Sequence, residues 1–338
     1  MTTARATQVN VASTPYYHCI SRCVRRAFLM GHDHATGQSF DHRKGWLLEE
    51  LARLTGVFAV EVCAYAVMSN HYHLVVRVDV ERVAGWEDAE VLARAEKLFP
   101  RAVRLAKEQP GRLTELLAVY RERLGSLSWF MRCLNEAIAR RANREDDCTG
   151  RFWEGRFKSQ PLLDAGALLT CMSYVDLNPV RAGLAGSLAG CDFTSIRARL
   201  ADVGHDLLRE QPQSTARNAP VPTEEGERGP ALVPFAEDER DAGLLGPLPM
   251  VFSDYVELVR FTGQALREGS AGTLPLSVVH ALHAVGLDDR VWLDTVRGFP
   301  SRFCAMLGER HLIALEAERQ GRSRPRGTPW ARKAYLAA

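Results

Sequence analysis

The chain of 338 residues is 46% hydrophobic and 25% charged, which is typical of a soluble globular protein and too long for a single ordinary core. No apolar run reaches the roughly 18 residues of a membrane-spanning helix. The N-terminal stretch contains no apolar signal region, so we expect a cytoplasmic protein with no membrane partner. The eight cysteines form no C-x-x-C pair and have no regular spacing, as in a reduced cytosolic protein.

Positive charge is concentrated in the first part of the chain. The formal net charge is +2, but residues 1–200 carry 27 Lys and Arg against 22 Asp and Glu, whereas residues 201–338 carry 16 against 19. The first part could therefore bind a polyanion such as nucleic acid. A solvated charged surface has a similar excess, and charge alone favours this plainer interpretation.

The first 80 residues predict a strand, a helix and two more strands. Alternation of apolar and polar residues predicts the first strand over 16–22. Apolar residues at helical spacing predict a helix over 40–54. Segments rich in Val, Phe and Tyr predict strands over 57–67 and 71–78, which are joined by a Ser-Asn turn.

The rest of the chain is predicted to be mainly helical. Apolar spacing predicts two or three helices in an insertion at about 85–143. Asp164 is placed to cap a helix over 165–177, which ends before an Asn-Pro pair because a residue preceding proline avoids helical geometry. Residues 201–248 have the Pro, Gly and Glu content of a linker, and helical periodicity returns afterwards. We therefore divide the chain into a domain over 1–200, a linker over 201–248 and a small helical region with a basic tail over 249–338.

Two histidines open the last of the predicted strands, in the stretch AVMSNHYHLVVRVD. Side chains alternate across a strand, so His71 and His73 should point to one face and Tyr72 to the other. Two imidazoles about 6–7 Å apart along a strand can share one metal ion. The alternative is a pair of half-exposed strand histidines, since a motif this short also occurs by accident.

The predicted helix over 165–177 carries Tyr174, and Asn178 follows four residues later. Positions i and i+4 share one helix face, so a tyrosine and a carboxamide could both face the two histidines. Alternatively, Tyr174 is a core aromatic and Asn178 only ends the helix. Arg181, just beyond, could contact a phosphate or only cap the helix end.

Basic and aromatic residues alternate in the stretch GRFWEGRFKS. Arg151, Arg156 and Lys158 could bind phosphates, while Trp153 and the flanking phenylalanines could stack on unpaired bases, as in proteins that bind single-stranded nucleic acid. The alternative is that the aromatic rings pack in the core and the basic groups are solvated.

The three motifs together resemble a known family. H-Y-H after an apolar strand, then GRFWEGRFKS, then SYVDLNPVRAGL resembles the HUH single-tyrosine transposases, and most closely the REP-associated tyrosine transposases and their longer proteobacterial relatives. The resemblance covers about residues 16–200. It implies an α+β domain, the HUH fold, in which helices pack on a central antiparallel sheet similar to the ferredoxin-like and RNA-recognition folds. The predicted order of strand, helix, strand, strand agrees with the start of such a domain.

The resemblance also implies roles for individual residues. His71 and His73 would bind a divalent ion, Mg or Mn, and Tyr174 would be the nucleophile that forms a 5′-phosphotyrosine link with single-stranded or hairpin DNA. Asn178 would be the third metal ligand. Many relatives have the longer Gln there, so Glu154 and Asp176 are further candidates for the third ligand. Relatives are often dimers, so a homodimer is open, and a bacterial, nucleoid-associated protein is implied.

Two other functional classes compete with a transposase. The first is a domesticated DNA-binding protein that keeps the fold but not the chemistry, although the tyrosine and both histidines are present. The second is a zinc hydrolase built on the two histidines, which would need a third strong ligand and no nucleophilic tyrosine. The chain contains no H-E-x-x-H motif, so we rank this class last.

Overall fold

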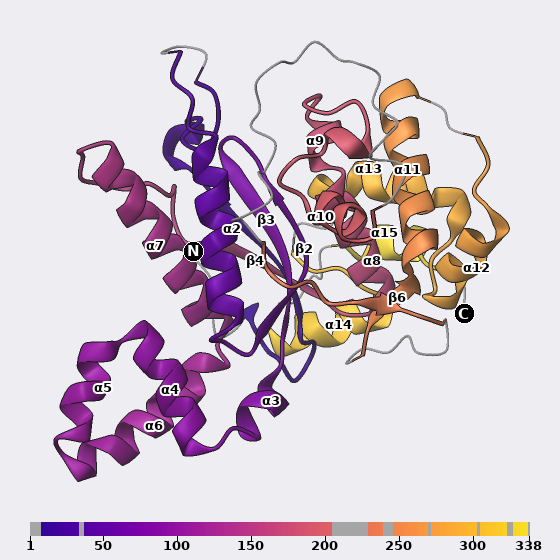
Figure 1. Ribbon diagram of the computed structural model, residues 1–338. Coiled ribbons are helices and arrows are strands. Elements are labelled where there is room, and N and C mark those ends of the chain that lie inside the picture. The colour runs from indigo at the N-terminus through magenta and orange to yellow at the C-terminus, as the bar shows by residue number, and fades with distance from the viewer. Residues whose placement is uncertain are drawn as a thin grey trace.

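The computed structural model describes residues 8–33, 37–204, 229–238, 246–269, 272–302, 305–322 and 327–336 (Figure 1). Its strands are β1 (Tyr16–Arg22), β2 (Val60–Val67), β3 (His71–Val78), β4 (Lys158–Leu162), β5 (Phe235–Ala236) and β6 (Leu248–Val251). The helices of the first 200 residues are α2 (His42–Thr55), α3 (Val80–Ala84), α4 (Asp88–Leu98), α5 (Pro100–Lys107), α6 (Pro110–Leu124), α7 (Leu127–Glu145), α8 (Ala165–Asp176), α9 (Asn178–Arg181) and α10 (Ser195–Asp202). They are followed by α11 (Phe252–Glu268), α12 (Leu276–Ala284), α13 (Trp292–Arg302), α14 (Arg310–Arg319) and α15 (Thr328–Ala334).

A four-stranded antiparallel sheet in the order β2-β3-β1-β4 is the centre of the molecule. With α2 after β1 and α7 before β4, the chain follows the strand–helix–strand–strand–helix–strand order of ferredoxin-like sheets. The predicted α+β class with an antiparallel sheet is therefore confirmed. The strand predicted from residue 57 begins only at Val60, because the amides of Val57 and Phe58 still bond to the Leu54 carbonyl at the end of α2.

The two faces of the sheet are covered by different helices, and the alternation of the strands decides which side chain meets which. Tyr17, Tyr72 and Leu74 point into a core formed with α2 and α7. Tyr16 and Val75 point into a second core, formed with α8. Figure 1 shows α2 and α7 on one side of the sheet and α8 on the other.

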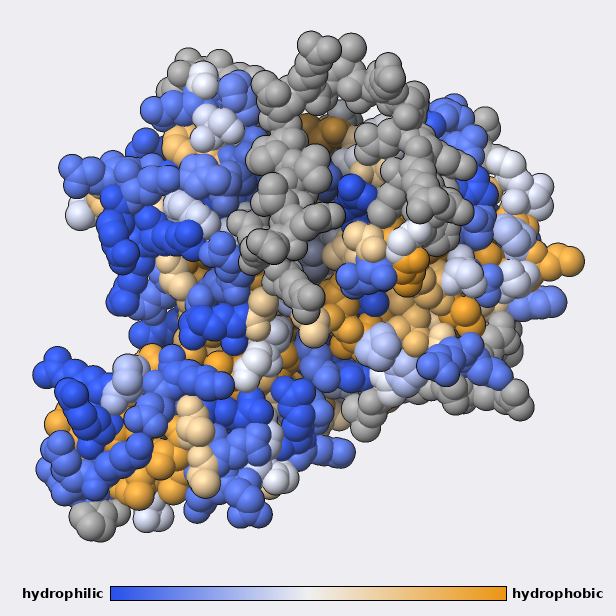
Figure 2. Space-filling view, in the orientation of Figure 1, coloured by the Kyte–Doolittle hydropathy of each residue, from blue (hydrophilic) through white to orange (hydrophobic). Residues whose placement is uncertain are grey.

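The helices between β3 and β4 divide into two groups. Helices α3 to α6 contact one another and project from the sheet, below and to the left in Figure 1. They carry the exposed apolar residues Leu105 and Val119, and Figure 2 shows orange among the blue over this part of the molecule. Helix α7 instead packs on α2 and supplies Phe130, Met131 and Leu134 to the core. The insertion expected over 85–143 thus contains one helix that belongs to the layer covering the sheet.

Helix α8 is buried on every side, which explains why its sequence is apolar all round. It lies between the sheet and the C-terminal helices, with α13 packed against it. A side chain at Gly166 would bring its Cβ within 2.8 Å of the Val285 carbonyl oxygen, so only glycine allows this approach. The N-cap Asp164 accepts from the amides of Ala167 and Glu309 and from the Tyr335 hydroxyl, each at 2.7 Å. One carboxylate therefore begins the helix and holds the C-terminal segment.

The C-terminal region shares its core with α8 rather than forming a separate one. Buried side chains of α11, α13 and α15 belong to the same apolar cluster as those of α8 and of one face of the sheet. The expected linker over 201–248 lies partly outside the described residues. Its described segment 229–238 packs along β2, where the Val233 amide bonds to the Val62 carbonyl at 2.9 Å.

Both edges of the four-stranded sheet are covered by later parts of the chain. On β2, the Val67 amide bonds to the Phe193 carbonyl at 3.0 Å, further along the same edge as Val233. On β4, the Leu307 amide bonds to the Pro161 carbonyl at 3.1 Å. Unpaired edges invite association with other chains, so this cover protects the sheet. Within the described residues, no helix is both long and apolar enough to cross a bilayer.

Candidate functional site

His71 and His73 lie on β3, on the face of the sheet that α8 covers. Their ring centroids are 5.0 Å apart, and His73 is almost completely buried. Tyr72 points to the opposite face, where its hydroxyl donates to Asn135 Oδ1 on α7 at 2.7 Å. The H-x-H motif thus places both imidazoles in one site, as the alternation of a strand predicts.

A third histidine, His18 on β1, joins them. Its Nε2 is 2.8 Å from His73 Nδ1, and its Nδ1 is 3.2 Å from Oε1 of Gln160 on β4. Sequence reasoning missed both residues. The alternation of 16–22 put His18 on a definite face of its strand, but only the order of the strands shows that β1 lies between β3 and β4.

Burial keeps the three imidazoles neutral. It lowers the pKa of His18 and of His71 to about 4. The pKa of His73 is lowered well below 6.5, first by burial and then by the neighbouring His18, His71 and Arg22. A neutral imidazole is the form that binds metal ions, so all three rings are in the ligand-competent state at neutral pH.

Tyr174, on α8, lies against these histidines. Its ring is edge-on to His73 at 5.6 Å and stacks on Phe299 of α13 at 4.5 Å, so only 8% of the residue is exposed. Asn178 hydrogen-bonds to it, one helical turn later. Burial raises the pKa of Tyr174, while Arg181 and the bond to Asn178 oppose that shift. The hydroxyl is therefore protonated at neutral pH.

Arg181 is held in place by the C-terminal region. Its guanidinium lies 5.1 Å from the centre of the Tyr174 ring and donates to the carbonyl oxygens of Val296 at 3.2 Å and Arg297 at 3.3 Å. The short helix that carries it, α9, begins at Asn178 and has Pro179 in its first turn, where no amide is needed. Arg181 thus orders the surroundings of Tyr174 and is only partly open to solvent.

The aromatic residues of GRFWEGRFKS are buried, as the core-packing alternative expects. The Trp153 ring packs edge-on against Tyr72 at 5.4 Å, and its Nε1 donates to the Asn135 carbonyl at 2.8 Å. Phe152 and Phe157 belong to the same core. These rings lie on the sheet face opposite the histidines, so they offer no surface to a stacked base here. An alternating aromatic and basic pattern does not show whether the aromatic rings pack in the core or are exposed for stacking on bases.

The basic residues of the same stretch are exposed. Within the described parts of the chain, Arg151, Arg156 and Lys158 form no ion pair. Lys158 opens β4 opposite Ile20, which in turn pairs with His73. Lys158 therefore lies in the same cross-strand row as His73, a candidate metal ligand.

A second basic segment lies beside this stretch. The Val24 amide bonds to the Phe152 carbonyl at 2.9 Å, and the Glu154 amide bonds to the Arg22 carbonyl at 2.8 Å. The 3-10 turn Val24–Arg26 exposes Arg25 and Arg26, with left-handed φ values of 53° and 57°. We call Arg22, Arg25, Arg26, Arg151 and Arg156 the basic ridge.

The basic ridge is tied directly to His71 through Asn70. The Asn70 carbonyl accepts from the Cys23 amide at 2.8 Å, and its Nδ2 donates to the Arg26 carbonyl at 3.2 Å. Its Oδ1 is 2.7 Å from His71 Nδ1. One asparagine thus fixes the position of the cations relative to the candidate metal site.

The residues present fit a metal ion with two imidazole ligands. Within the described residues, Nε2 of the buried His73 has no hydrogen-bond partner, and a bare imidazole nitrogen is a natural metal ligand. No cluster of three or more His, Cys, Asp or Glu side chains suited to a metal occurs in that part of the chain. The remaining positions would be filled by a neutral oxygen donor such as Asn178 and by water, which Mg²⁺ usually retains.

The two substitutes for Asn178 are not placed for this role. Asp176 is fully buried and accepts from the Ser195 hydroxyl at 2.5 Å, the Ile196 amide at 2.8 Å and the Tyr255 hydroxyl at 2.6 Å. Its oxygens therefore join α8 to α10 and α11. Glu154 is exposed on the loop before β4. Of the predicted site residues, the structure brings together His71, His73, Tyr174, Asn178 and Arg181.

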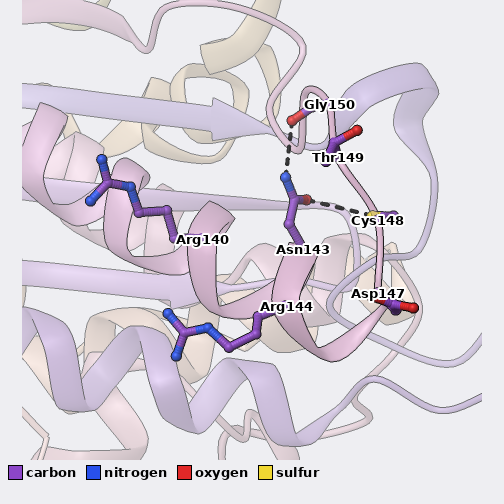
Figure 3. Close-up of a pocket in the computed structure, with 7 residues that line it drawn as sticks. All are labelled: Arg140, Asn143, Arg144, Asp147, Cys148, Thr149 and Gly150. Atoms are coloured by element: carbon purple, nitrogen blue, oxygen red, sulfur yellow. Dashed lines mark hydrogen bonds between the residues drawn. The ribbon is translucent and has the colours of Figure 1, made fainter.

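A separate open pocket lies at the C-terminal end of α7 (Figure 3). It is lined by Arg140, Asn143, Arg144 and residues 147–150. Figure 3 shows the Asn143 side chain bonded to the Gly150 carbonyl, at 3.0 Å, and directed toward Cys148. The pocket contains none of the predicted site residues.

Comparison with known proteins gives one distant similarity. No family model matches the chain, and no curated protein matches it. Among solved structures, a REP-associated tyrosine transposase bound to a REP hairpin is 14% identical to this chain, covers 68% of it and 98% of its own length, and has a TM-score of 0.35. With so low a TM-score, this likeness establishes neither a shared fold nor a shared function.

Proposed function

We propose that the chain is a metal-assisted single-tyrosine transposase, which cuts and rejoins single-stranded DNA. The observation that carries the proposal is the meeting of a tyrosine with two neutral histidines: Tyr174 lies edge-on to His73, whose Nε2 is buried without a partner among the described residues. A structural tyrosine needs no such neighbour. A nucleophilic tyrosine does, because its unperturbed pKa near 10 makes it a weak nucleophile at neutral pH.

The proposed reaction exchanges one phosphate ester for another. The Tyr174 oxygen attacks the scissile phosphorus, the bond from phosphorus to the 3′ oxygen breaks, and the tyrosine proton ends on the released 3′ hydroxyl. His71 and His73 would hold the ion, with Asn178 as the third protein ligand. When bound there, Mg²⁺ or Mn²⁺ would supply Lewis-acid stabilisation of the phosphate and of the departing oxygen. Because the phosphotyrosine link keeps the ester energy, a second 3′ hydroxyl can reverse the step and join a new strand.

The basic ridge supports single-stranded or hairpin DNA as the substrate. Its five arginines and Lys158 have no acidic partner among the described residues, and Asn70 ties the ridge to His71. Unpaired cations in a row can follow a phosphate backbone, and such binding weakens steeply with salt. A strand that follows the ridge would end at the histidines, where cleavage is proposed.

One observation favours a second candidate, a DNA-binding protein without catalysis. Tyr174 is stacked on Phe299 and mostly buried, as a core aromatic would be. In this case the ridge would still bind DNA, while the hydroxyl of Tyr174 would have no chemical role.

The substitution Tyr174→Phe distinguishes the two candidates, because it removes one oxygen and keeps the ring. Wild-type protein with a hairpin oligonucleotide and Mn²⁺ should form a covalent adduct that survives SDS, and peptide mapping should place the DNA on Tyr174. The variant should bind the hairpin normally and form no adduct. Tyr72→Phe is the matched control on the other face of the sheet, and it should keep full activity per folded molecule.

Each other outcome has a definite meaning. Tight binding without cleavage by the wild type would favour the non-catalytic candidate. Hydrolysis without any adduct would favour a metallohydrolase. An adduct on another tyrosine would show that the nucleophile is wrongly assigned.

A further inference from the structure

We infer that His18 and Gln160 are positioning residues, which fix His73 in the tautomer that leaves Nε2 without a proton and directed at the metal position. The inference rests on the proposed metal role of His73, and it concerns two residues that the proposed reaction does not otherwise use. It follows from three observations: the hydrogen-bond chain across the sheet, the direction in which that chain runs, and the nitrogen at its end, which has no partner among the residues that the structure describes.

The chain of hydrogen bonds crosses three adjacent strands. Gln160 lies on β4, His18 on β1 and His73 on β3. The links are 3.2 Å from Gln160 Oε1 to His18 Nδ1 and 2.8 Å from His18 Nε2 to His73 Nδ1. The centroids of the two imidazoles are 5.1 Å apart and their planes differ by only 15°, so the rings are nearly parallel. All three side chains are buried, so water does not compete for these bonds.

The direction of the chain follows from what each atom can do. The Gln160 oxygen can only accept, so His18 Nδ1 must carry a proton. A neutral imidazole has one proton, which leaves His18 Nε2 as an acceptor. The proton in the next bond therefore belongs to His73 Nδ1. His73 Nε2 is then left with a free lone pair, and it is the atom that lacks a partner among the described residues.

His71 has the same arrangement with a different partner. Its Nδ1 is 2.7 Å from Asn70 Oδ1, and Asn70 Nδ2 is engaged with the Arg26 carbonyl, which orients the carboxamide with its oxygen toward the ring. His71 Nδ1 must donate, and its Nε2 is also left with a lone pair. Both histidines thus present Nε2, and hydrogen bonds of this kind to metal-binding histidines orient the ring and raise its basicity.

A purely structural role for the pair predicts something different. If His18 and Gln160 only satisfied buried polar groups, the chain would be expected to continue to a partner for His73 Nε2, because buried polar atoms are normally hydrogen-bonded. Instead, Nδ1 of His73 is bonded to the directed chain, and its buried Nε2 has no partner among the described residues, which is unfavourable for a buried polar atom. This asymmetry is what a prepared ligand requires.

The first test reads the tautomer directly, in the metal-free wild-type protein. Long-range ¹H–¹⁵N NMR of the full chain, labelled with ¹⁵N-histidine at pH 7.5, should show His18 and His73 protonated at Nδ1 and unprotonated at Nε2. The His73 signals are assigned by their loss in His73→Ala. A proton on His73 Nε2 would overturn the inference, whether or not the protein binds a metal.

The second test removes the end of the chain. Gln160→Met has a similar length and no acceptor, and we expect it to mix the His73 tautomers and to raise the Kd for Mn²⁺, followed by EPR of the free ion, by about 10–100-fold. Gln160→Asn keeps a neutral amide acceptor and should retain more of the wild-type tautomer than Gln160→Met does. If Gln160→Met leaves tautomer and affinity unchanged, the positioning role is wrong. If the tautomers are as expected but the wild type binds no Mn²⁺, the role of the hydrogen-bond chain in fixing the tautomer is supported and the proposed metal role is wrong.

Discussion

Both faces of the central sheet are covered by helices, but their polar side chains are satisfied in different ways. On the face covered by α2 and α7, the polar atoms of Tyr72 and Trp153 both find partners on Asn135. On the face covered by α8, two histidines and Gln160 form a directed chain that ends at His73 Nε2, an atom with no partner in the described part of the chain. Burial alone therefore does not mark the candidate site. The difference lies in which polar atoms are left unsatisfied.

Strand β3 contributes to both faces, so neighbouring residues allow a matched test with the largest expected effect. Tyr72→Ala should lower the free energy of unfolding by about 3–5 kcal/mol, because it removes a buried ring and leaves a cavity. His71→Ala should change it by less than about 1 kcal/mol, because His71 is only half-buried. Urea unfolding of both variants and Mn²⁺ titration of the folded protein measure the two effects.

The comparison between the faces predicts opposite outcomes for metal binding. His71→Ala should abolish Mn²⁺ binding and DNA cleavage, whereas Tyr72→Ala should keep Mn²⁺ binding at temperatures where it is folded. Loss of stability in His71→Ala as large as that in Tyr72→Ala would show that the histidine is a packing residue. Undiminished cleavage in EDTA by the wild type would remove the metal from the mechanism.

The histidine face should also make stability depend on pH. Between the unfolded pKa of 6.5 and the folded value of about 4, His18 and His71 bind fewer protons when folded than when unfolded. Stability therefore falls as pH decreases through this window. By pH 5 the loss should be about 2 kcal/mol for each fully shifted histidine.

Denaturant unfolding of the metal-free protein at pH 7.5, 6.5, 5.5 and 5.0 measures this loss. The buried Asp164 and Asp176 act in the opposite direction, because burial raises the pKa of each carboxyl group and protonation then favours the folded state. The variant His71→Gln should show a shallower decrease than the wild type because one titrating group is gone. Constant stability over the whole range would mean that these rings are not held neutral.

The smallest expected effects on stability and DNA binding distinguish the buried Trp153 from the exposed Arg156 of the basic ridge. Trp153→Phe should cost roughly 1 kcal/mol of stability, because the bond to the Asn135 carbonyl is lost, and should leave DNA binding per folded molecule unchanged. Arg156→Ala should leave stability unchanged and weaken hairpin binding, with the salt slope reduced by about 1. Fluorescence anisotropy with a labelled hairpin at several salt concentrations tests both variants. Weaker binding by folded Trp153→Phe would restore the stacking role.

Local signals in the sequence were sufficient for much of the fold. The alternation in 71–78 predicts two histidines on one face, and Asp164 is the N-cap of α8, as the sequence predicts. Both features depend on residues that are close to each other in the sequence. They do not depend on how distant segments pack.

The features that sequence reasoning missed all depend on tertiary arrangement. His18 joins the site only because β1 lies between β3 and β4, and strand order is not encoded in the alternation of any one strand. The rings of Trp153 and Phe157 pack on the face opposite the histidines, which their basic neighbours could not reveal. The contact of Phe299 with Tyr174 joins residues 125 positions apart, and no periodicity reports such a distance.

The cover on the sheet edges has a consequence for the newly made chain. Strand β4 ends at Leu162, but the segment that shields its edge includes Leu307. At a synthesis rate of about 5–20 residues per second, the edge would remain open on the ribosome for roughly 7–30 s after β4 is made. During that interval the nascent chain presents unpaired strand groups to its neighbours on the polysome. We therefore expect its yield to depend on chaperones and on the rate of translation across residues 163–307.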